Sequence, residues 1–147
     1  MREVKRSALV GRPPEELFAL INDIESYPQF LPWCSDARVL SRSAQEIVAT
    51  LGVRQGALHG EFTTRNLLEP PHRIRLQLVR GPFRTLDGEW LLTPIEPHGC
   101  RVELGVRFAF RNPLTGLLFE PQFAGTVGSL VDAFVARARA RADAPPP

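Results

Sequence analysis

Residues 101–138, RVELGVRFAFRNPLTGLLFEPQFAGTVGSLVDAFVARA, contain the strand and the helix that decide the predicted fold. Apolar residues occupy alternate positions from Arg101 to Phe110, which is the pattern of a strand with one buried and one solvent-facing side. After Asn112, apolar residues recur every three or four positions, as in a helix that packs one face against a core. Asn112 suits the N-cap and Pro113 the first helical position, so a helix is expected to begin directly after the strand.

Three residues inside this helix lower its helical propensity. Pro121 lacks a backbone N–H, and we expect it to kink or break the element into a short helix and then a long one. Gly125 and Gly128 each lower helix propensity by roughly 1 kcal/mol relative to alanine. We expect these glycines either to let the helix approach the sheet closely or to leave space beneath it.

The preceding segments predict a strand, a helix and a series of further strands. Residues 3–10 alternate as a strand, and Pro13, Pro14 and two glutamates then open a helix whose apolar face ends near Ile24. Residues 27–34 contain two prolines and cannot form a long helix or a central strand. A period of two runs from about residue 36 onward. It predicts strands at 37–40, 46–51, 59–68, 73–78, 83–92 and 101–110.

Asp87 and Gly88 interrupt the predicted strand at 83–92. They could form a two-residue hairpin turn or a β-bulge. We favour the bulge, because a hairpin at this point would leave two very short arms.

These elements predict an α+β fold in which a curved antiparallel sheet of about seven strands wraps around a long C-terminal helix. We expect one domain at residues 1–142, followed by a disordered proline-rich tail at residues 143–147. A sheet bent around one helix usually leaves an apolar space at its open end, where small hydrophobic ligands bind.

Composition and charge do not by themselves call for a particular class of partner. The 18 basic and 16 acidic residues leave a net charge of +2, so no DNA or other polyanionic partner is required. All basic residues except Lys5 are arginines, which we interpret as codon bias rather than as a nucleic-acid signature. Cys34 and Cys100 form no metal-ligand spacing, and we expect two buried free thiols.

The chain shows no targeting or membrane-spanning segment. No apolar run approaches the ~18–20 residues that a membrane span needs. The N-terminal residues are charged where a secretory signal would be apolar. We therefore expect a cytoplasmic protein, and we leave open a peripheral contact with the inner membrane.

No catalytic or metal site is predicted. His59, His72 and His98 are isolated from one another and from the cysteines. The chain has no glycine-rich phosphate loop, no nucleophile elbow and no carboxylate pair at a spacing typical of acid–base chemistry. We therefore expect a binding protein and not an enzyme.

Several polar and aromatic residues are candidates for ligand contact. Thr64 and Asn66 alternate in phase with Phe62, so they are expected to point into the core. A buried amide without partners costs on the order of 1–3 kcal/mol. The pair is therefore either a satisfied core network or a polar handle inside a pocket. Tyr27 is likewise either a core aromatic or a hydrogen bonder to a ligand.

Two further groups allow a functional and a purely structural interpretation. Phe30, Leu31 and Trp33 lie on the proline-bounded connection, where they either pack at the core and rim or form a membrane-dipping or ligand-gating loop. The second group consists of arginines on the polar sides of two predicted strands, which form either a basic contact face or an ordinary solvated face. This group consists of Arg73, Arg75, Arg101 and Arg107.

Five short motifs carry a resemblance to a known family. They are ND (22–23), YPQFLPWC (27–34), FTTRN (62–66), GPF leading to GEW (81–90) and CRV (100–102). With these motifs the chain resembles the coenzyme Q-binding START-like family, over nearly its whole length. That family belongs to the polyketide cyclase/dehydrase and lipid transport superfamily and also contains the ribosome-association toxin RatA.

The resemblance implies a helix-grip (START-like, Bet v 1-like) fold and three functions. Mitochondrial members bind ubiquinone without catalysis, so our main hypothesis is binding of ubiquinone or a related isoprenoid lipid in support of respiratory quinone function. The alternative is a RatA-like toxin that binds the large ribosomal subunit and blocks subunit association. A cyclase-type enzyme is the third hypothesis, and the predicted apolar face offers it no clear acid or base.

The ligand-binding residues that we predict come from the apolar sides of the strands, the proline-rich connection and the C-terminal helix. They are Tyr27, Phe30, Leu31, Trp33, Phe62, Thr64, Asn66, Leu76, Trp90, Leu104, Val106, Phe108, Phe123, Val127, Leu130 and Phe134. No cofactor other than a bound ubiquinone is expected.

Overall fold

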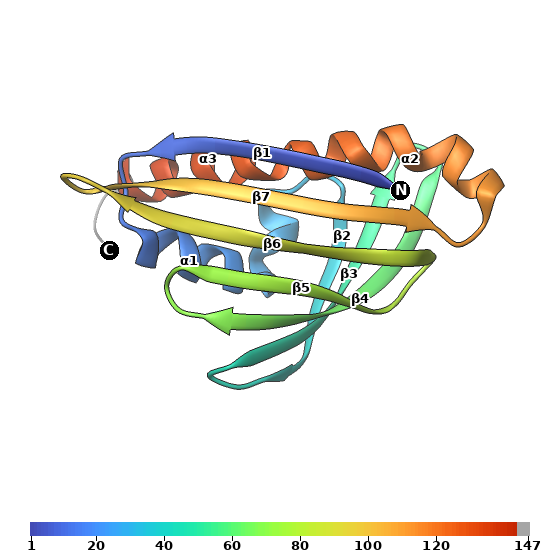
Figure 1. The fold of residues 1–147 in the computed structure, drawn as a ribbon, viewed down its shortest axis with the longest axis horizontal. Coiled ribbons are helices and arrows are strands. Elements are labelled where there is room, and N and C mark those ends of the chain that lie inside the picture. The colour runs from blue at the N-terminus through green and yellow to red at the C-terminus, as the bar shows by residue number, and fades with distance from the viewer. Residues whose placement is uncertain (144–147) are drawn as a thin grey trace.

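Seven antiparallel strands form one sheet in the computed structural model, which describes residues 1–143. The strands lie in the order β1-β7-β6-β5-β4-β3-β2, so the chain meanders from β2 to β7 and the first strand pairs with the last (Figure 1). Their bounds are β1 (Arg2–Val10), β2 (Cys34–Arg42), β3 (Glu46–Gln55), β4 (Leu58–Glu69), β5 (Arg73–Arg80), β6 (Phe83–Ile95) and β7 (Gly99–Phe110).

The helices lie together on one face of this sheet, behind it in the view of Figure 1. They are α1 (Pro14–Asn22), the 3-10 helix η1 (Ile24–Gln29), α2 (Pro113–Gly128) and α3 (Leu130–Asp143). The predicted α+β architecture, with a sheet wrapped around a long C-terminal helical element, is confirmed. The predicted tail begins at residue 143, where α3 ends, and its residues 144–147 lie outside the described part of the chain.

Proline and asparagine set the helix starts as the sequence predicts. Pro14 is the first residue of α1, with Glu15 and Glu16 in the first turn, where they interact favourably with the helix dipole. Asn112 caps α2, because its side-chain oxygen accepts a hydrogen bond from the backbone N–H of Leu114 at 2.8 Å.

The break in the C-terminal helical element lies at Ser129, and the expectation of a break at Pro121 is wrong. Helix α2 continues through Pro121 and gives two helices of 16 and 14 residues. The Ser129 hydroxyl donates to the carbonyl of Thr126 at 2.7 Å, while the Ser129 N–H is shared between the carbonyls of Gly125 and Thr126. Such local side-chain bonds compete with the helical ladder and mark the junction.

Gly125 and Gly128 of α2 do not bring the helix close to the sheet backbone. Gly125 is exposed, and a Cβ at this position would meet no atom within 4 Å. A Cβ on Gly128 would lie 3.1 Å from Nη2 of Arg6. Gly128 therefore makes room for the guanidinium of Arg6, and the prediction for Gly125 is wrong because that residue faces solvent.

Asp87 and Gly88 lie in regular pairing, so the predicted bulge at these residues is also wrong. Asp87 pairs with Arg107 and Gly88 with Val106, and the irregularity of β6 falls earlier, between Phe83 and Thr85. Gly88 has a packing role instead. A Cβ on it would lie 2.5 Å from the carbonyl oxygen of Gly105, so only glycine allows the strands to approach this closely.

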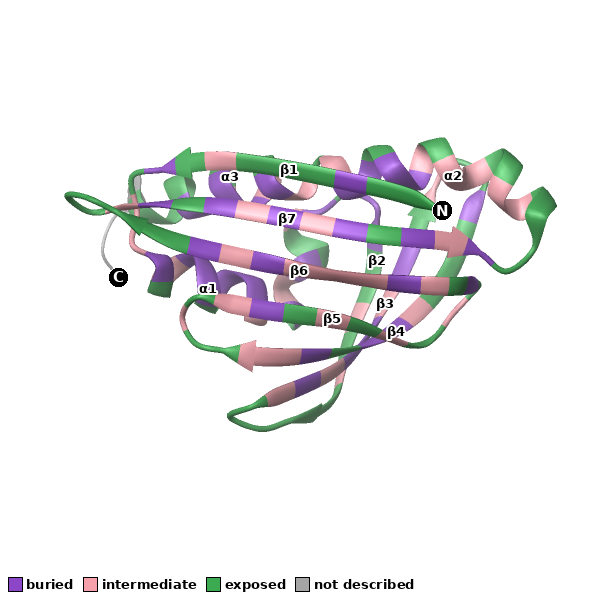
Figure 2. Cartoon of the chain, viewed as in Figure 1, coloured by how far each residue is buried: buried purple, intermediate pink, exposed green. Residues whose placement is uncertain are grey.

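The sheet and the helices share one apolar core, as the alternating burial along the strands shows (Figure 2). Strand β7 buries Val102, Leu104, Val106, Phe108 and Phe110, as the alternation predicts. Helix α3 contributes a buried row of Val131, Phe134, Val135 and Ala138. The helix pair α2–α3 thus covers the apolar face of the sheet.

Replacing Gly88 tests the close approach of β6 and β7. Gly88→Ala is expected to lower the free energy of unfolding by about 1–3 kcal/mol, because the new methyl group must displace backbone. The matched control is Gly105→Ala, whose Cβ would meet only the Lys5 side chain at 3.8 Å. The control should stay within about 1 kcal/mol of the parent. Urea unfolding followed by circular dichroism measures both, and equal values for the two variants would contradict the assignment.

Candidate functional site

An apolar cavity of about 90 Å³ lies between the sheet, α1, η1 and the α2–α3 pair. Its lining combines side chains from the inner face of the sheet with side chains from all of these helices. The lining residues are Ile21, Ile24, Tyr27, Trp33, Ala49, Leu51, Phe62, Thr64, Asn66, Leu76, Leu86, Trp90, Val106, Phe123, Thr126, Val127, Leu130 and Phe134.

Most of the predicted ligand-binding residues lie at this cavity, and four do not. Leu31, Leu104 and Phe108 are buried in the core beside it, and Phe30 lies at its rim. Phe108 contacts Phe83 and Phe123, with its ring centroid 4.8 Å from that of Phe123. These residues point inward as predicted, but the space at their positions is filled by neighbouring side chains. Ligand contact by the residues at the cavity stays a prediction.

The sequence analysis missed six lining residues, namely Ile21, Ile24, Ala49, Leu51, Leu86 and Thr126. Ile21 and Ile24 have the spacing of an apolar helix face, whose end the sequence predicts near Ile24, but nothing in the local pattern places that face against the cavity. The alternation of β3 gives Ala49 and Leu51 a common side of the strand, which is the signal that could have included them.

The size of the cavity limits what it holds. Ligand pockets for molecules of drug size are usually about 300–1,000 Å³. An apolar cavity of about 150 Å³ is large enough to bind benzene. At about 90 Å³, the cavity accommodates a small fragment, and a quinone ring with its chain requires the covering helices to move.

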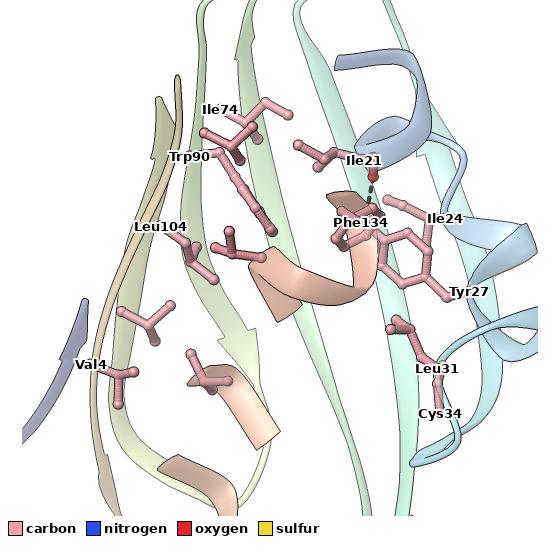
Figure 3. Close-up of a cluster of buried hydrophobic side chains, with 14 of the residues drawn as sticks. Val4, Ile21, Ile24, Tyr27, Leu31, Cys34, Ile74, Trp90, Leu104 and Phe134 are labelled. Carbon is pink, nitrogen blue, oxygen red and sulfur yellow. Dashed lines mark hydrogen bonds between the residues drawn. The ribbon is translucent and has the colours of Figure 1, made fainter. Parts of the chain in front are cut away.

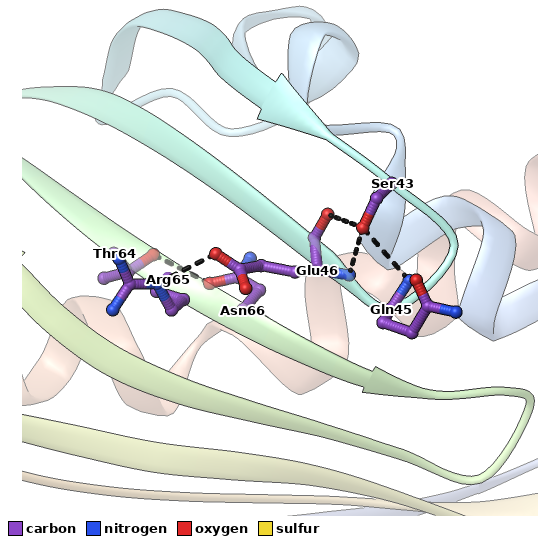
Figure 4. A network of polar contacts seen from close by, with 6 residues as sticks. All are labelled: Ser43, Gln45, Glu46, Thr64, Arg65 and Asn66. Carbon is purple, nitrogen blue, oxygen red and sulfur yellow. Dashed lines mark hydrogen bonds and ion pairs between the residues drawn. The ribbon is translucent and has the colours of Figure 1, made fainter.

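Thr64 and Asn66 supply a polar pair on the cavity wall. The Thr64 hydroxyl donates to the side-chain oxygen of Asn66 at 2.8 Å, and both residues are buried on β4 (Figure 4). On the opposite side of the same strand, Arg65 donates to Glu46 at 2.8 Å. The inward orientation that the alternation predicts is therefore confirmed. The Thr64–Asn66 bond satisfies one acceptor, and no hydrogen bond joins the Asn66 amide nitrogen to another described residue.

Tyr27 is a core aromatic whose hydroxyl is already used. This hydroxyl donates to the backbone carbonyl of Ile21, which ties η1 to α1 (Figure 3). Its ring packs edge-on against Phe134, with centroids 5.4 Å apart. Burial raises the pKa of Tyr27 far above its usual range, with smaller contributions from Cys34 and Asp23. The hydroxyl is therefore protonated and engaged with the backbone, which disfavours the ligand-bonding interpretation.

The proline-bounded connection forms core and rim. Leu31 and Trp33 are buried, and Phe30 is half-buried with the guanidinium of Arg137 lying 5.0 Å from its ring centroid. The indole N–H of Trp33 is buried and has no hydrogen-bond partner within the described residues. A buried donor without a partner is energetically costly. Trp33 is therefore a candidate for contact with a ligand oxygen, in addition to the amide nitrogen of Asn66.

The arginines on the outer face of the sheet are mostly neutralised by acidic neighbours. Arg73 lies 3.4 Å from Glu89 and Arg107 lies 3.0 Å from Asp87. Arg75 lies 3.7 Å from Glu69. Of the four arginines proposed as a basic face, only Arg101 has no ion pair within residues 1–143. This face is therefore a mixed-charge surface and not a continuous cationic one.

The lining of the cavity is poorly equipped for catalysis. It contains no carboxylate, imidazole, ammonium or guanidinium group, so no general acid or base is positioned there. Among the described residues, no three side chains of the metal-ligating types gather as an ion site. No described helix is both long and apolar enough to span a bilayer. The site is suited to holding an apolar group.

Comparison with known proteins gives a family and a set of relatives. The sequence profile described as polyketide cyclase / dehydrase and lipid transport matches residues 10–135. The ribosome association toxin RatA of Vibrio cholerae is 41% identical over 139 residues, covering 95% of this chain and 96% of the toxin. The RatA protein of Escherichia coli K12 is 38% identical, covering 95% of this chain and 88% of that protein.

Further matches are a more distant sequence relative and two solved structures with the same fold. The mitochondrial coenzyme Q-binding protein COQ10 of Drosophila melanogaster is 25% identical, and the match covers 95% of this chain and 60% of that protein. The Zhui aromatase/cyclase of Streptomyces superposes with a TM-score of 0.87 at 18% identity, covering 97% of this chain and 96% of the enzyme. The protein CC1736 of Caulobacter crescentus gives a TM-score of 0.77 at 28% identity, covering 98% of this chain and all of that protein.

Both thiols are free and buried, as predicted. Burial raises the pKa of Cys34 to about 11, and burial together with the charge of Glu15 raises that of Cys100. Because the thiolate is the reactive form, both thiols should react with a thiol reagent at neutral pH at least about tenfold more slowly in the folded protein than in the unfolded chain.

The raised pKa of Cys34 predicts that the free energy of unfolding depends on pH. The ordinary thiol pKa is 9.0, and the folded value for Cys34 is about 11. The protonated thiol therefore stabilises the folded protein below pH 9, and this contribution is lost as the pH rises toward about 11. Urea unfolding of the parent and of Cys34→Ala across this interval measures the loss. Fast thiol labelling of the folded protein at neutral pH would contradict the enclosure of these groups.

Proposed function

Because this chain belongs to the polyketide cyclase/dehydrase and lipid transport family, and its relatives named for ribosome association match nearly its whole length, we propose that it acts on the ribosome. In this proposal the chain binds the large ribosomal subunit and blocks its association with the small one. The observation that carries the proposal is the 41% identity over 95% of the chain.

The proposed activity is binding without catalysis. A protein that blocks subunit association needs a complementary surface and no reactive groups, and the cavity wall offers no positioned acid or base. Since ribosomal surfaces are rich in RNA phosphate, arginines would supply part of the affinity, and binding should weaken steeply with salt. We expect this surface to involve arginines outside the ion-paired outer face of the sheet, because a guanidinium without a carboxylate neighbour can form charge-assisted hydrogen bonds to phosphate without first giving up a partner.

Ribosome sedimentation tests this function. Added in excess to purified bacterial ribosomal subunits, the folded protein is expected to lower the peak of intact ribosomes and raise the two subunit peaks in a sucrose gradient. It should co-sediment with the large-subunit peak. The effect should decline across a series of rising salt concentrations, because phosphate contacts release counterions on binding. An unchanged profile at low salt and large protein excess would reject the proposal.

A second candidate function is binding of ubiquinone or a related isoprenoid lipid, which the apolar cavity and the distant likeness to a coenzyme Q-binding protein support. A quinone carbonyl could accept hydrogen bonds from the Asn66 amide and the Trp33 indole N–H, and isoprene units could contact Val127 and Leu130. The small volume requires that the α2–α3 pair shift outward when the ligand enters.

A variant whose side chain fills the cavity distinguishes quinone binding from ribosome binding. Val127 lines the cavity at 5% exposure, and Val127→Phe places a ring in the available space. We expect this variant to lose about tenfold or more in affinity for a short-chain ubiquinone, measured by tryptophan fluorescence quenching, at a stability cost of about 1–3 kcal/mol. Val127→Ile is the matched control, since it adds one methylene and leaves most of the space.

The same two variants also test whether the effect on ribosomal subunits depends on the cavity. If blocking subunit association is the function, both variants should still block it as the parent does. Loss of the ribosome effect in Val127→Phe alone would mean that the cavity and the ribosome surface act together. Equal quinone affinity in all three proteins would reject the cavity as the quinone site.

A further inference from the structure

Three leucines at the start of α2 point into solvent. Leu114, Leu117 and Leu118 are 70%, 78% and 69% exposed, and their spacing places them on one face of the helix. The start of α2 is correspondingly coloured as exposed in Figure 2. Contiguous exposed apolar side chains of this kind mark surfaces that are covered by a partner.

Arginines without ion pairs lie at the same end of the molecule. Arg80 ends β5, Arg84 follows at the start of β6, and Arg111 links β7 to α2. All three are exposed, and none forms an ion pair within the described chain. The contrast with the paired arginines of the sheet's outer face leaves this end with uncompensated positive charge.

Backbone contacts hold the arginine-bearing segments together. The Arg111 guanidinium donates to the carbonyl of Gly81 at 2.7 Å, and the Arg111 N–H donates to the carbonyl of Pro82 at 2.9 Å. The turn between β5 and β6 therefore lies beside the start of α2, as Figure 1 shows at the right-hand end of the molecule. Leucines and arginines thus lie at the same end of the molecule, which we call the α2 end: Arg80, Arg84, Arg111, Leu114, Leu117 and Leu118.

We propose that the α2 end docks onto an anionic lipid bilayer, with the three leucines inserted at the level of the acyl chains and the three arginines against the headgroups. This combination is that of interfacial helices, in which leucines enter the membrane boundary and cationic side chains face anionic lipid. RNA would use the arginines but has no complementary surface for three aliphatic side chains. The proposal goes beyond the proposed ribosome function and does not depend on it.

A cluster of phenylalanines connects this end with the cavity. Phe123 of α2 packs against Phe83 and Phe110, with ring centroids 5.0 Å and 6.1 Å from its own. Phe123 and Phe62 also line the apolar cavity. The α2 end therefore lies at the outer side of an aromatic group whose inner side borders the cavity, so a docked bilayer would meet the molecule close to its apolar interior.

Vesicle flotation tests the proposal. The full chain is mixed with vesicles of phosphatidylcholine alone or of phosphatidylcholine with phosphatidylglycerol. We expect binding to the anionic vesicles and at least about tenfold weaker binding to the neutral ones, with a decline as salt is raised. Leu117→Ser/Leu118→Ser should lower binding to anionic vesicles by about tenfold or more, because it removes apolar side chains from the interface. Arg80→Gln/Arg84→Gln should abolish most of the preference for anionic lipid.

Matched controls use exposed residues elsewhere on the chain. Leu9 is 60% exposed on β1 at the other end of the sheet, and Leu9→Ser should bind vesicles as the parent does. Arg101→Gln/Arg139→Gln removes two arginines that form no ion pair within residues 1–143 and lie away from the α2 end, and it should also leave binding unchanged. Equal loss in the controls and in the α2-end variants would overturn the proposal.

Two further measurements identify other partners for this surface. If the parent floats with neither vesicle, and Leu117→Ser/Leu118→Ser instead loses co-sedimentation with the large ribosomal subunit, the surface is a ribosome contact and the membrane proposal is wrong. If sedimentation velocity shows that the parent is a dimer and this variant a monomer, the leucines cover a second copy of the chain. That result also overturns the proposal. Failure of the ribosome experiment with the parent leaves the vesicle result unaffected.

Discussion

Phe134 of α3 lies at the centre of the contact between the helix pair and the sheet, 1% exposed and with its ring 5.3 Å from that of Trp90 and 5.4 Å from that of Tyr27. This contact joins three separate parts of the chain: the C-terminal helix, the middle of the sheet and the 3-10 helix that follows α1 (Figure 3). A single sheet with one apolar face has to be covered, and the α2–α3 pair provides most of the cover. Burial of a ring of this size contributes about 1.5–3 kcal/mol to the stability of the folded chain.

A second aromatic group lies one helix earlier, and the cavity lies between the two. Phe123 packs against Phe108 with centroids 4.8 Å apart, while Phe134 packs against Trp90. Bulky rings at these two points hold the helices away from the sheet, and the smaller Val127 between them does not fill the space that results. The cavity is therefore a consequence of where the large and small side chains fall along the helix pair.

The sequence predicts the elements well and their interruptions poorly. Alternation and helical spacing are local properties, so the strands, the cap at Asn112 and the inward orientation of Thr64 and Asn66 could be predicted from the residues themselves. Pro121 and Gly88 were misjudged because their effect depends on neighbours distant in the sequence. Pro121 lies in a helix that tertiary packing maintains, and Gly88 is required by the carbonyl of Gly105 on the adjacent strand.

The candidate site likewise has features that the sequence predicts and features that depend on neighbours distant in the sequence. Which side of a strand faces the core could be predicted, but which core residues border empty space could not. Phe108 and Val106 share one side of β7, yet only Val106 reaches the cavity, because Phe123 fills the space beside Phe108. The strand alternation contains no information on this difference, since it depends on the size of a side chain from another element.

The distribution of charge cannot be inferred from the net charge of +2. Arginines on the outer face of the sheet lie beside acidic residues that cross-strand pairing brings to them, as Arg107 lies beside Asp87. Arg80, Arg84 and Arg111 lie at strand ends, where no facing strand supplies an acid. Positive charge consequently accumulates at the end of the sheet that also presents the exposed leucines of α2. A nearly neutral chain can thus carry locally unpaired positive charge, because sheet pairing neutralises charges within the sheet and leaves those at its ends.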